Sequence, residues 1–247
     1  MTKNKSMREM SRYIDLDIYH AVESSHPYYV QMVAHILRFI SGLAVKSPKP
    51  LRVLELGAGT GLFTESLMKT TNIQVDAVEL DQECIRHLEG HITSANLKVI
   101  FGNAITYCKA EYYDVVVSVF AHDHIHYNQA KQFSANIRNN LKHGGYYLMG
   151  GEILPFYSND KERFEALITY HGFIITKALR EGHYELAQIE INALKSGIEM
   201  LGDCKRHEKL FEEEMLSSPF SMEEKVKIGP DMENIGGVFV YNFKATQ

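Results

Sequence analysis

The chain has 247 residues, of which 45% are hydrophobic and 23% are charged, and its formal net charge at pH 7 is −5. These values indicate a globular protein of one α/β domain with additions, and the acidic balance argues against a nucleic-acid backbone as the main partner, which would need a basic face. No stretch is long enough to cross a membrane, residues 1–12 lack the apolar core of a signal peptide, and three separated cysteines without a CxxC pair favour the cytoplasm.

Residues 13–45 have the apolar spacing of two helices, separated by a break at residues 24–27. The first helix is rich in tyrosine, and Tyr13 and Tyr19 are candidates for contact with a bound substrate. Packing of both helices on a sheet through their apolar faces is the alternative interpretation. The two prolines at 47–50 then predict a stiff linker, because proline bars both a helix and a central strand.

The central feature of the sequence is an apolar, β-branched run at 51–56 that is interrupted by Gly57, Gly59 and Gly61. The run predicts a buried strand, and helical spacing resumes directly after the glycines. Glycine is needed at such a turn because the backbone approaches a ligand closely, with dihedral angles that a Cβ would forbid. The helix start beyond the turn adds free N–H groups and a partial positive charge. The unit is typical of a nucleotide site.

The glycine spacing and one acid indicate which nucleotide is bound. Leu62 stands where the dinucleotide pattern G-x-G-x-x-G has its third glycine, and Glu55 suits a ligand with a cationic amino group. The stretch E-L-G-A-G-T-G resembles the first motif of the class I S-adenosylmethionine (SAM)-dependent methyltransferases. A glycine turn that binds nothing is the alternative. The resemblance implies that SAM is held by residues of this stretch: Glu55, Gly57, Ala58, Gly59 and Gly61.

The next two strands, expected at 73–80 and 97–101, extend this resemblance. Glu79 lies about twenty residues past the glycines, where a carboxylate accepts hydrogen bonds from both ribose hydroxyls; a solvated acid at a strand end is the alternative. Asn103 stands where the family usually has an aspartate that contacts the adenine amino group, and its carbonyl oxygen can accept the same bond. The resemblance implies further cofactor contacts at the ends of these two strands and of the fourth strand: Leu80, Ala104, Phe120 and Ala121.

A group of histidines follows the fourth strand, which is expected at 113–120. Ligands of open α/β sheets bind at the carboxyl ends of the strands, so this group should face the reaction. Three interpretations stay open. His124, with His122 as the second candidate, acts as a general base; His122, Asp123, His124 and His126 form a metal site; or the histidines only support the loop.

A helix at 128–141, a glycine cap at 144–145 and a fifth strand at 146–149 are expected next. Glu152 follows this strand, and it either faces the substrate or is a surface acid. Residues 160–216 have helical spacing with an interruption at 202–207, and this is too long for a structureless loop. It carries Tyr170, another candidate substrate contact, although core packing is the alternative for that ring.

Two closing strands, at 222–228 and 237–244, resemble the antiparallel end of the methyltransferase sheet. The predicted fold is therefore α/β: a Rossmann-like, mostly parallel seven-stranded sheet with helices on both faces. The predicted parts are an N-terminal helical lid, which the resemblance implies, a SAM-binding core, a helical insertion that acts as substrate cap or dimer contact, and a strand pair that completes the sheet: 1–45, 46–152, 153–218 and 219–247.

The predicted function is a SAM-dependent methyltransferase that methylates an O, N or C nucleophile of a small molecule. We expect no metal, nucleic acid or membrane partner, a cytoplasmic location, and an oligomeric state that allows a homodimer. The end of the fourth strand, F-A-H-D-H, lacks the N-P-P-Y type of motif of nucleic-acid amino-methyltransferases. The alternatives are a SAM-binding sensor or non-catalytic partner subunit, a metal-dependent hydrolase using the histidines and, last, an NAD-dependent oxidoreductase.

Overall fold

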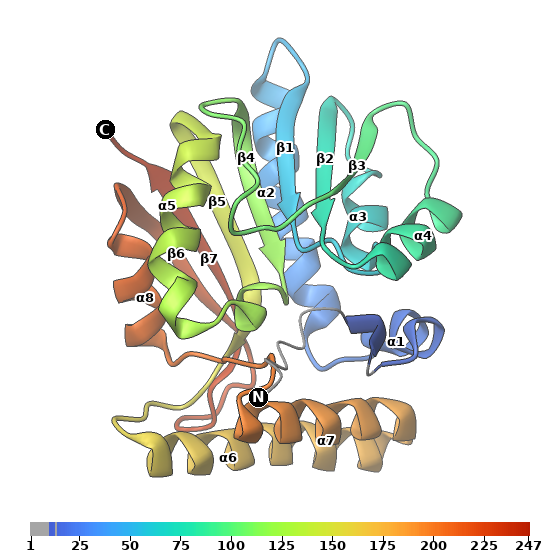
Figure 1. Ribbon diagram of the computed structural model, residues 1–247, viewed down its shortest axis with the longest axis vertical. Helices are drawn as coiled ribbons and strands as arrows, with labels where there is room; N and C mark the ends of the chain where they lie inside the picture. Colours follow the sequence, from blue (N-terminus) through green and yellow to red (C-terminus); the bar gives the residue numbers. More distant parts are fainter. Residues whose placement is uncertain (1–9, 13) are drawn as a thin grey trace, which may run out of the picture.

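A computed structural model describes residues 10–12 and 14–247 of the chain. The centre of the molecule is a seven-stranded sheet with the order β3-β2-β1-β4-β5-β7-β6 (Figure 1). Neighbouring strands from β3 to β5 are parallel, whereas β7 is antiparallel to both β5 and β6. The strands are β1 (Leu51–Leu56), β2 (Ile73–Glu79), β3 (Leu97–Phe101), β4 (Tyr113–Val119), β5 (Leu141–Ile153), β6 (Phe220–Gly229) and β7 (Gly237–Ala245). The predicted fold class is confirmed.

Helices cover both faces of the sheet because its strands are apolar on both sides. One face packs against α2 (Tyr29–Lys46), α3 (Leu62–Leu67) and α4 (Gln82–His91), which bury side chains such as Ile36 and Phe63 with Val53 of the central strand. The other face packs against α5 (Ala130–Asn140) and α8 (Glu208–Leu216), with Phe133 and Phe211 in the core. The two hydrophobic clusters hold the strand ends in fixed positions.

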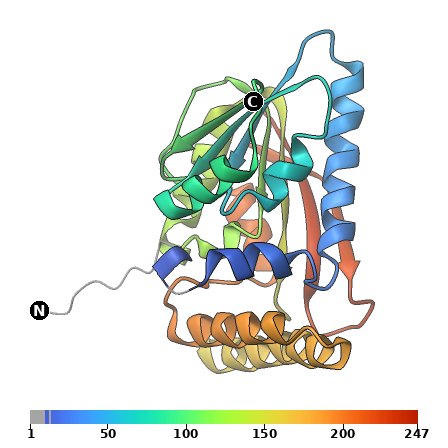
Figure 2. The same ribbon diagram turned by 90° about the vertical axis from the view of Figure 1, so that its right-hand side faces the viewer.

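A third layer lies across the carboxyl end of the parallel strands. It consists of α1 (Leu16–Glu23) and a hairpin of α6 (Asp160–Glu181) and α7 (Tyr184–Glu199), and both views place α1 between the sheet and the hairpin (Figures 1 and 2). Three short 3₁₀ turns complete the chain: η1 (Met10–Arg12), η2 (His122–His124) and η3 (Tyr127–Gln129). The expected helical regions are thus present, and their roles as lid and cap stay predictions.

The prediction around the fifth strand was wrong at both ends. Helix α5 ends at Asn140, and β5 already pairs with β4 at Leu141, so the two glycines lie inside the strand rather than at a helix cap. The register shifts there, and a Cβ on Gly145 would lie 3.0 Å from the carbonyl oxygen of Asp114, so glycine permits the close approach. The strand continues to Ile153 because β7 pairs with it along this length. A local sequence pattern cannot reveal such a partner.

Candidate active site

A cavity with about 1250 Å³ of empty space lies at the carboxyl ends of β1, β2 and β4. The glycine turn after β1 forms one wall, with φ angles of +76° at Gly57 and +54° at Gly59. These angles lie in the left-handed region that disfavours residues with a Cβ. Among the described residues, a Cβ on Gly59 would have only Met10 Cε within 4 Å, at 3.9 Å, so these residues leave the space above it open. The turn therefore brings bare backbone to the cavity.

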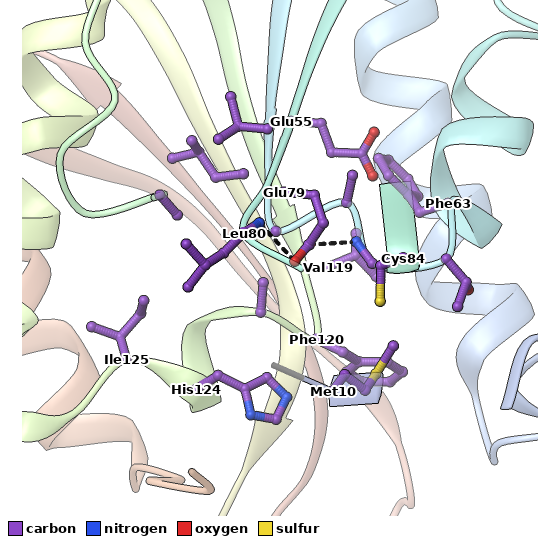
Figure 3. A pocket seen from close by; sticks show the side chains of 18 of the residues that line it. Met10, Glu55, Phe63, Glu79, Leu80, Cys84, Val119, Phe120, His124 and Ile125 are labelled. Atoms are coloured by element: carbon purple, nitrogen blue, oxygen red, sulfur yellow. Dashed lines mark hydrogen bonds between the residues drawn. The ribbon is translucent and has the colours of Figure 1, made fainter. Parts of the chain in front are cut away.

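Glu79 at the end of β2 holds this turn in place. Its Oε2 accepts a hydrogen bond from the Gly59 N–H at 2.8 Å, and its Oε1 accepts from the backbone of Leu80 and Asp81 at 2.8 and 2.9 Å (Figure 3). Each carboxylate oxygen can accept two hydrogen bonds, so the side chain can also accept from a ligand hydroxyl. The acid thus links the two strand ends that a nucleoside would contact.

Glu55 is a buried acid in the wall of the same cavity, with 2% of its surface exposed. Its Oε2 accepts a hydrogen bond from Thr64 Oγ1 at 2.8 Å, and among the described residues Oε1 accepts none. Burial raises the pKa of Glu55 to about 8. This carboxyl group is removed from water and has a hydrogen bond to only one of its oxygens. It therefore suits a ligand with a cationic amino group, whose charge would favour the ionised carboxylate.

Asn103 also lies in the cavity wall, where its Oδ1 accepts a hydrogen bond from the backbone of Ile105 at 2.8 Å. One lone pair of this oxygen remains for a ligand donor. Of the residues predicted to bind the cofactor, the cavity brings ten together: Glu55, Gly57, Ala58, Gly59, Glu79, Leu80, Asn103, Ala104, Phe120 and Ala121. Gly61 is not among the lining residues; a Cβ on it would lie 2.8 Å from Leu88 Cγ, so it serves the packing of α4.

The structure separates the three histidines after β4. His124 is exposed and lines the cavity, beside Phe120 and Met10 (Figure 3). Its Nδ1 is 2.7 Å from the carbonyl oxygen of Gly202, which can only accept, so Nδ1 carries the proton and Nε2 of the neutral ring keeps its lone pair. His126 lies outside the lining and pairs with Asn128 Oδ1 at 2.8 Å.

His122 is buried away from the cavity and in contact with Phe133 and Phe211. Burial lowers its pKa to about 4, against the opposing effect of Glu214, whose Oε2 lies 3.5 Å from Nε2. The residue therefore packs beneath the loop and does not reach a ligand. Within the described parts of the chain, one set of His and carboxylate side chains has ligand atoms that all lie within 4.8 Å of one another: His26, Glu152 and Glu190. The group after β4, for which a metal site was one of the three interpretations, is not such a set.

A second cavity, with about 720 Å³ of empty space, adjoins the first one under α1 and α7. Met10, Tyr19, Glu23, Phe120 and His124 line both cavities. The two cavities therefore form adjacent compartments that meet at His124.

The residues predicted to contact the substrate differ in their position relative to the two cavities. Tyr19 lines both cavities and Glu152 lines the second one. Tyr170 is buried behind that cavity, where its hydroxyl donates a hydrogen bond to Glu152 Oε1 at 2.8 Å. Tyr13 lies outside the residues that the structure describes. Sequence reasoning missed Glu23, because an isolated acid in an amphipathic helix resembles a solvated side chain.

Glu152 is the centre of a buried network. Its Oε1 lies 2.9 Å from His26 Nε2, and its Oε2 lies 3.0 Å from Lys205 Nζ. Burial alone would raise the pKa of Glu152, but Lys205 and His26 outweigh it and hold that pKa well below its usual range. Burial likewise opposes the charge of His26, yet the adjacent glutamates raise its pKa to about 9. Glu152 is therefore an ionised and fully paired carboxylate, not the surface acid of the alternative interpretation.

The part of the chain that matches a known protein family supplies most of the residues that line the first cavity. Residues 53–145 match the family model of a methyltransferase domain. A curated relative, the tRNA1(Val) (adenine(37)-N6)-methyltransferase of Tolumonas auensis, is 33% identical over 73 residues, which are 27% of this chain and 30% of that protein. The chain thus spans less than a third of the length of that relative.

Solved structures share the fold over most of the chain. The N-methyltransferase NodS from Bradyrhizobium japonicum WM9, in complex with S-adenosyl-L-homocysteine, has a TM-score of 0.58 at 13% identity, covering 90% of this chain and 89% of that chain. The CurJ carbon methyltransferase has a TM-score of 0.66 at 14% identity, covering 94% and 59%. At these identities the likeness concerns the fold alone.

The order of the sheet is that of a Rossmann-like fold, and the glycine turn and the two acids that line its first cavity lie within the matched methyltransferase domain. The matched domain and the shared fold support a class I SAM-dependent methyltransferase, a family whose methyl donor is SAM. Across residues 10–12 and 14–247, no helix has the length and apolar character that spanning a membrane would require.

Proposed function

We propose that the chain transfers the methyl group of SAM to a small molecule bound in the second cavity. The observation that carries this proposal is the junction of the two cavities, which share Met10, Tyr19, Glu23, Phe120 and His124. A methyltransferase must place its nucleophile in line with the methyl group and away from water. Two adjoining compartments, one for each reactant, meet this need.

The residues of the first cavity suit the three parts of SAM. Glu55 would hold the methionine ammonium, Glu79 the ribose hydroxyls and Asn103 the adenine amino group. When bound, SAM supplies a methyl group that is already activated by its sulfonium sulfur. The protein therefore has to orient the acceptor and to remove its proton where the acceptor carries one.

His124 is the group that we assign to proton removal. It lines both cavities, and the hydrogen bond from Nδ1–H to the Gly202 carbonyl fixes the ring with Nε2 as the basic nitrogen. His122 has no such role in this proposal, since it lines neither cavity and its pKa of about 4 makes it a weak base.

The second cavity favours a small acceptor because α1 and α7 line it, and the net charge of −5 disfavours a polyanion. The exclusion of nucleic acid has no support from the comparisons, since one curated relative is a tRNA methyltransferase. RNA methylation is therefore the second candidate function. The homodimer stays a prediction.

Calorimetry with SAM, with NAD as the control, tests the donor site first. We expect SAM to bind with a micromolar dissociation constant and NAD to give no heat of binding. No heat of binding with SAM would refute the assignment of the glycine turn as the donor site. Transfer of labelled methyl from SAM is then measured to a mixture of small amines, alcohols and phenols and, separately, to unmodified tRNA. Label in the small molecules supports the proposal, and label in tRNA alone overturns it.

A further inference from the structure

The second cavity is acidic, and this points to the chemical class of its occupant. Cationic partners are few in its lining, where Lys205 and His26 face five carboxyl groups: Glu23, Asp123, Glu152, Glu190 and Asp203. These groups come from α1, η2, β5, α7 and the loop before α8, so five separate segments each contribute one acid to the lining. Burying so many acids is costly unless each one is paired with a cation or a hydrogen-bond donor.

Three of the five carboxyl groups have such partners. Asp203 pairs with Lys205, and Glu152 lies between Lys205 and His26 at 3.0 and 2.9 Å. Glu190 Oε2 lies 2.8 Å from His171 Nδ1. Each of these three acids is therefore paired with a base.

Glu23 and Asp123 are the exceptions. Each side chain is 6% exposed, and each lines the second cavity. Among the described residues, neither carboxyl group accepts a hydrogen bond. Burial raises the pKa of both groups to about 7, Glu23 against the effect of His26 and Asp123 against that of Lys205. Two buried carboxyl groups facing one cavity without a donor form a receptor for a cation with several N–H groups.

Extending the function proposed above, on which this inference rests, we propose that the methyl acceptor is an alkyl or arylalkyl amine that binds as its ammonium ion between Glu23 and Asp123. Glu23 also lines the first cavity, so an ammonium held there lies at the junction with the donor site. Ile14, Phe120 and Ile189 supply the apolar walls for a hydrocarbon chain. A divalent metal ion fits less well, because the ammonium group of Lys205 already occupies the space beside Glu152.

The reaction step balances with groups already described. The ammonium loses one proton to Nε2 of His124, and the freed nitrogen lone pair forms a bond to the methyl carbon. The bond between that carbon and sulfur breaks, and its electron pair stays on the sulfur. The product is a methylated ammonium ion, and the proton on His124 leaves to the solvent. Because the product is again a cation, the two carboxylates stabilise both the acceptor and the product.

Binding is measured by calorimetry on protein loaded with S-adenosyl-L-homocysteine, using butylamine and phenethylamine beside butanol and phenethyl alcohol. We expect at least one amine to bind about tenfold or more tightly than its alcohol, because the alcohol lacks a charged hydrogen bond that is worth about tenfold in affinity. We also expect its binding to release protons, seen as a dependence of the heat on the buffer, since both carboxyl groups must ionise. Equal binding of amine and alcohol, or no amine binding below about 10 mM, overturns the inference.

Two variants connect this binding to the carboxyl groups. Glu23→Gln and Asp123→Asn should each weaken amine binding about tenfold or more and lower proton release, whereas Glu23→Asp should retain part of the affinity. Glu199→Gln, an exposed change at the end of α7, is the matched control. SAM affinity is measured in every variant, so that a collapsed site is recognised by loss of both ligands. Amine affinities that stay at the wild-type value in the variants overturn the inference.

Turnover separates this inference from the proposed function. Labelled methyl transfer to a neutral acceptor, unaffected by Glu23→Gln and Asp123→Asn, refutes the amine and leaves small-molecule methylation standing. Amine binding that depends on Glu23 and Asp123, without methyl transfer to any small molecule, refutes the proposed function.

Discussion

The glycine turn allows a substitution whose effect on the ligand can be separated from its effect on folding. Gly59→Val places a β-branched residue at φ +54°. The left-handed backbone costs about 1–2 kcal/mol for a residue with a Cβ, and β-branching adds to this cost. Residues 10–12 and 14–247 leave room for the new atoms, because beyond the two chain neighbours of Gly59 the nearest of their heavy atoms to the added Cβ is Met10 Cε, at 3.9 Å. The two methyl groups therefore extend into the cavity.

We expect SAM affinity in Gly59→Val to fall by at least about 100-fold, or about 2.7 kcal/mol, because the side chain takes the space next to the bare backbone. Gly144→Val is the matched control: its φ is +72°, a Cβ there meets nothing within 4 Å, and the residue does not line the cavity. Denaturant unfolding should show a similar loss of stability in both variants. Calorimetry should show lost SAM affinity only in the first, and unchanged affinity in Gly59→Val would refute the site.

Three further outcomes follow from the site. Glu79→Ala should weaken SAM binding by roughly 1–3 kcal/mol, measured by calorimetry, since it removes acceptors for the ribose and frees the turn; wild-type affinity contradicts this role. His124→Ala should lower the methyl-transfer rate about 10²–10⁴-fold at unchanged SAM affinity, and an equal loss of both would show that the ring only shapes the pocket. In ligand-free protein Glu55 has a raised folded pKa of about 8, so its contribution to stability is complete below its unfolded pKa of 4.5 and is lost as the pH rises to about 8. Glu55→Gln should remove this decline from pH-dependent unfolding curves; an unaltered slope would exclude Glu55 as its source.

The donor side of the site could be predicted because it is local in sequence. The strand at 51–56, the glycines after it and the acid at the end of β2 follow one another along the chain, and backbone geometry dictates their arrangement. The third strand, Leu97–Phe101, likewise has the predicted bounds. Short-range patterns suffice where a parallel sheet imposes the long-range order.

The acceptor side could not be predicted because its residues meet only through tertiary packing. Glu23 and Asp123 are one hundred residues apart, and although Asp123 stands in the histidine group after the fourth strand, nothing in the sequence pairs it with Glu23. Tertiary packing also explains why the prediction of His122 as a second base is not supported. In an extended segment His122 and His124 would lie on the same side, but the chain makes a 3₁₀ turn there and the two rings separate. Burial by α8, a helix far along the chain, decides what His122 does.

The position of β7 between β5 and β6 has a consequence for synthesis on the ribosome. Strand β6 precedes β7 in the chain but pairs only with it, so β6 has no place in the sheet until residues 237–245 have emerged. Until then β5 also presents an unpaired apolar edge, a feature that invites association between chains. The parallel strands can thus assemble early, whereas the helices between β5 and β6 become fixed at both ends only after residues 237–245 have been made.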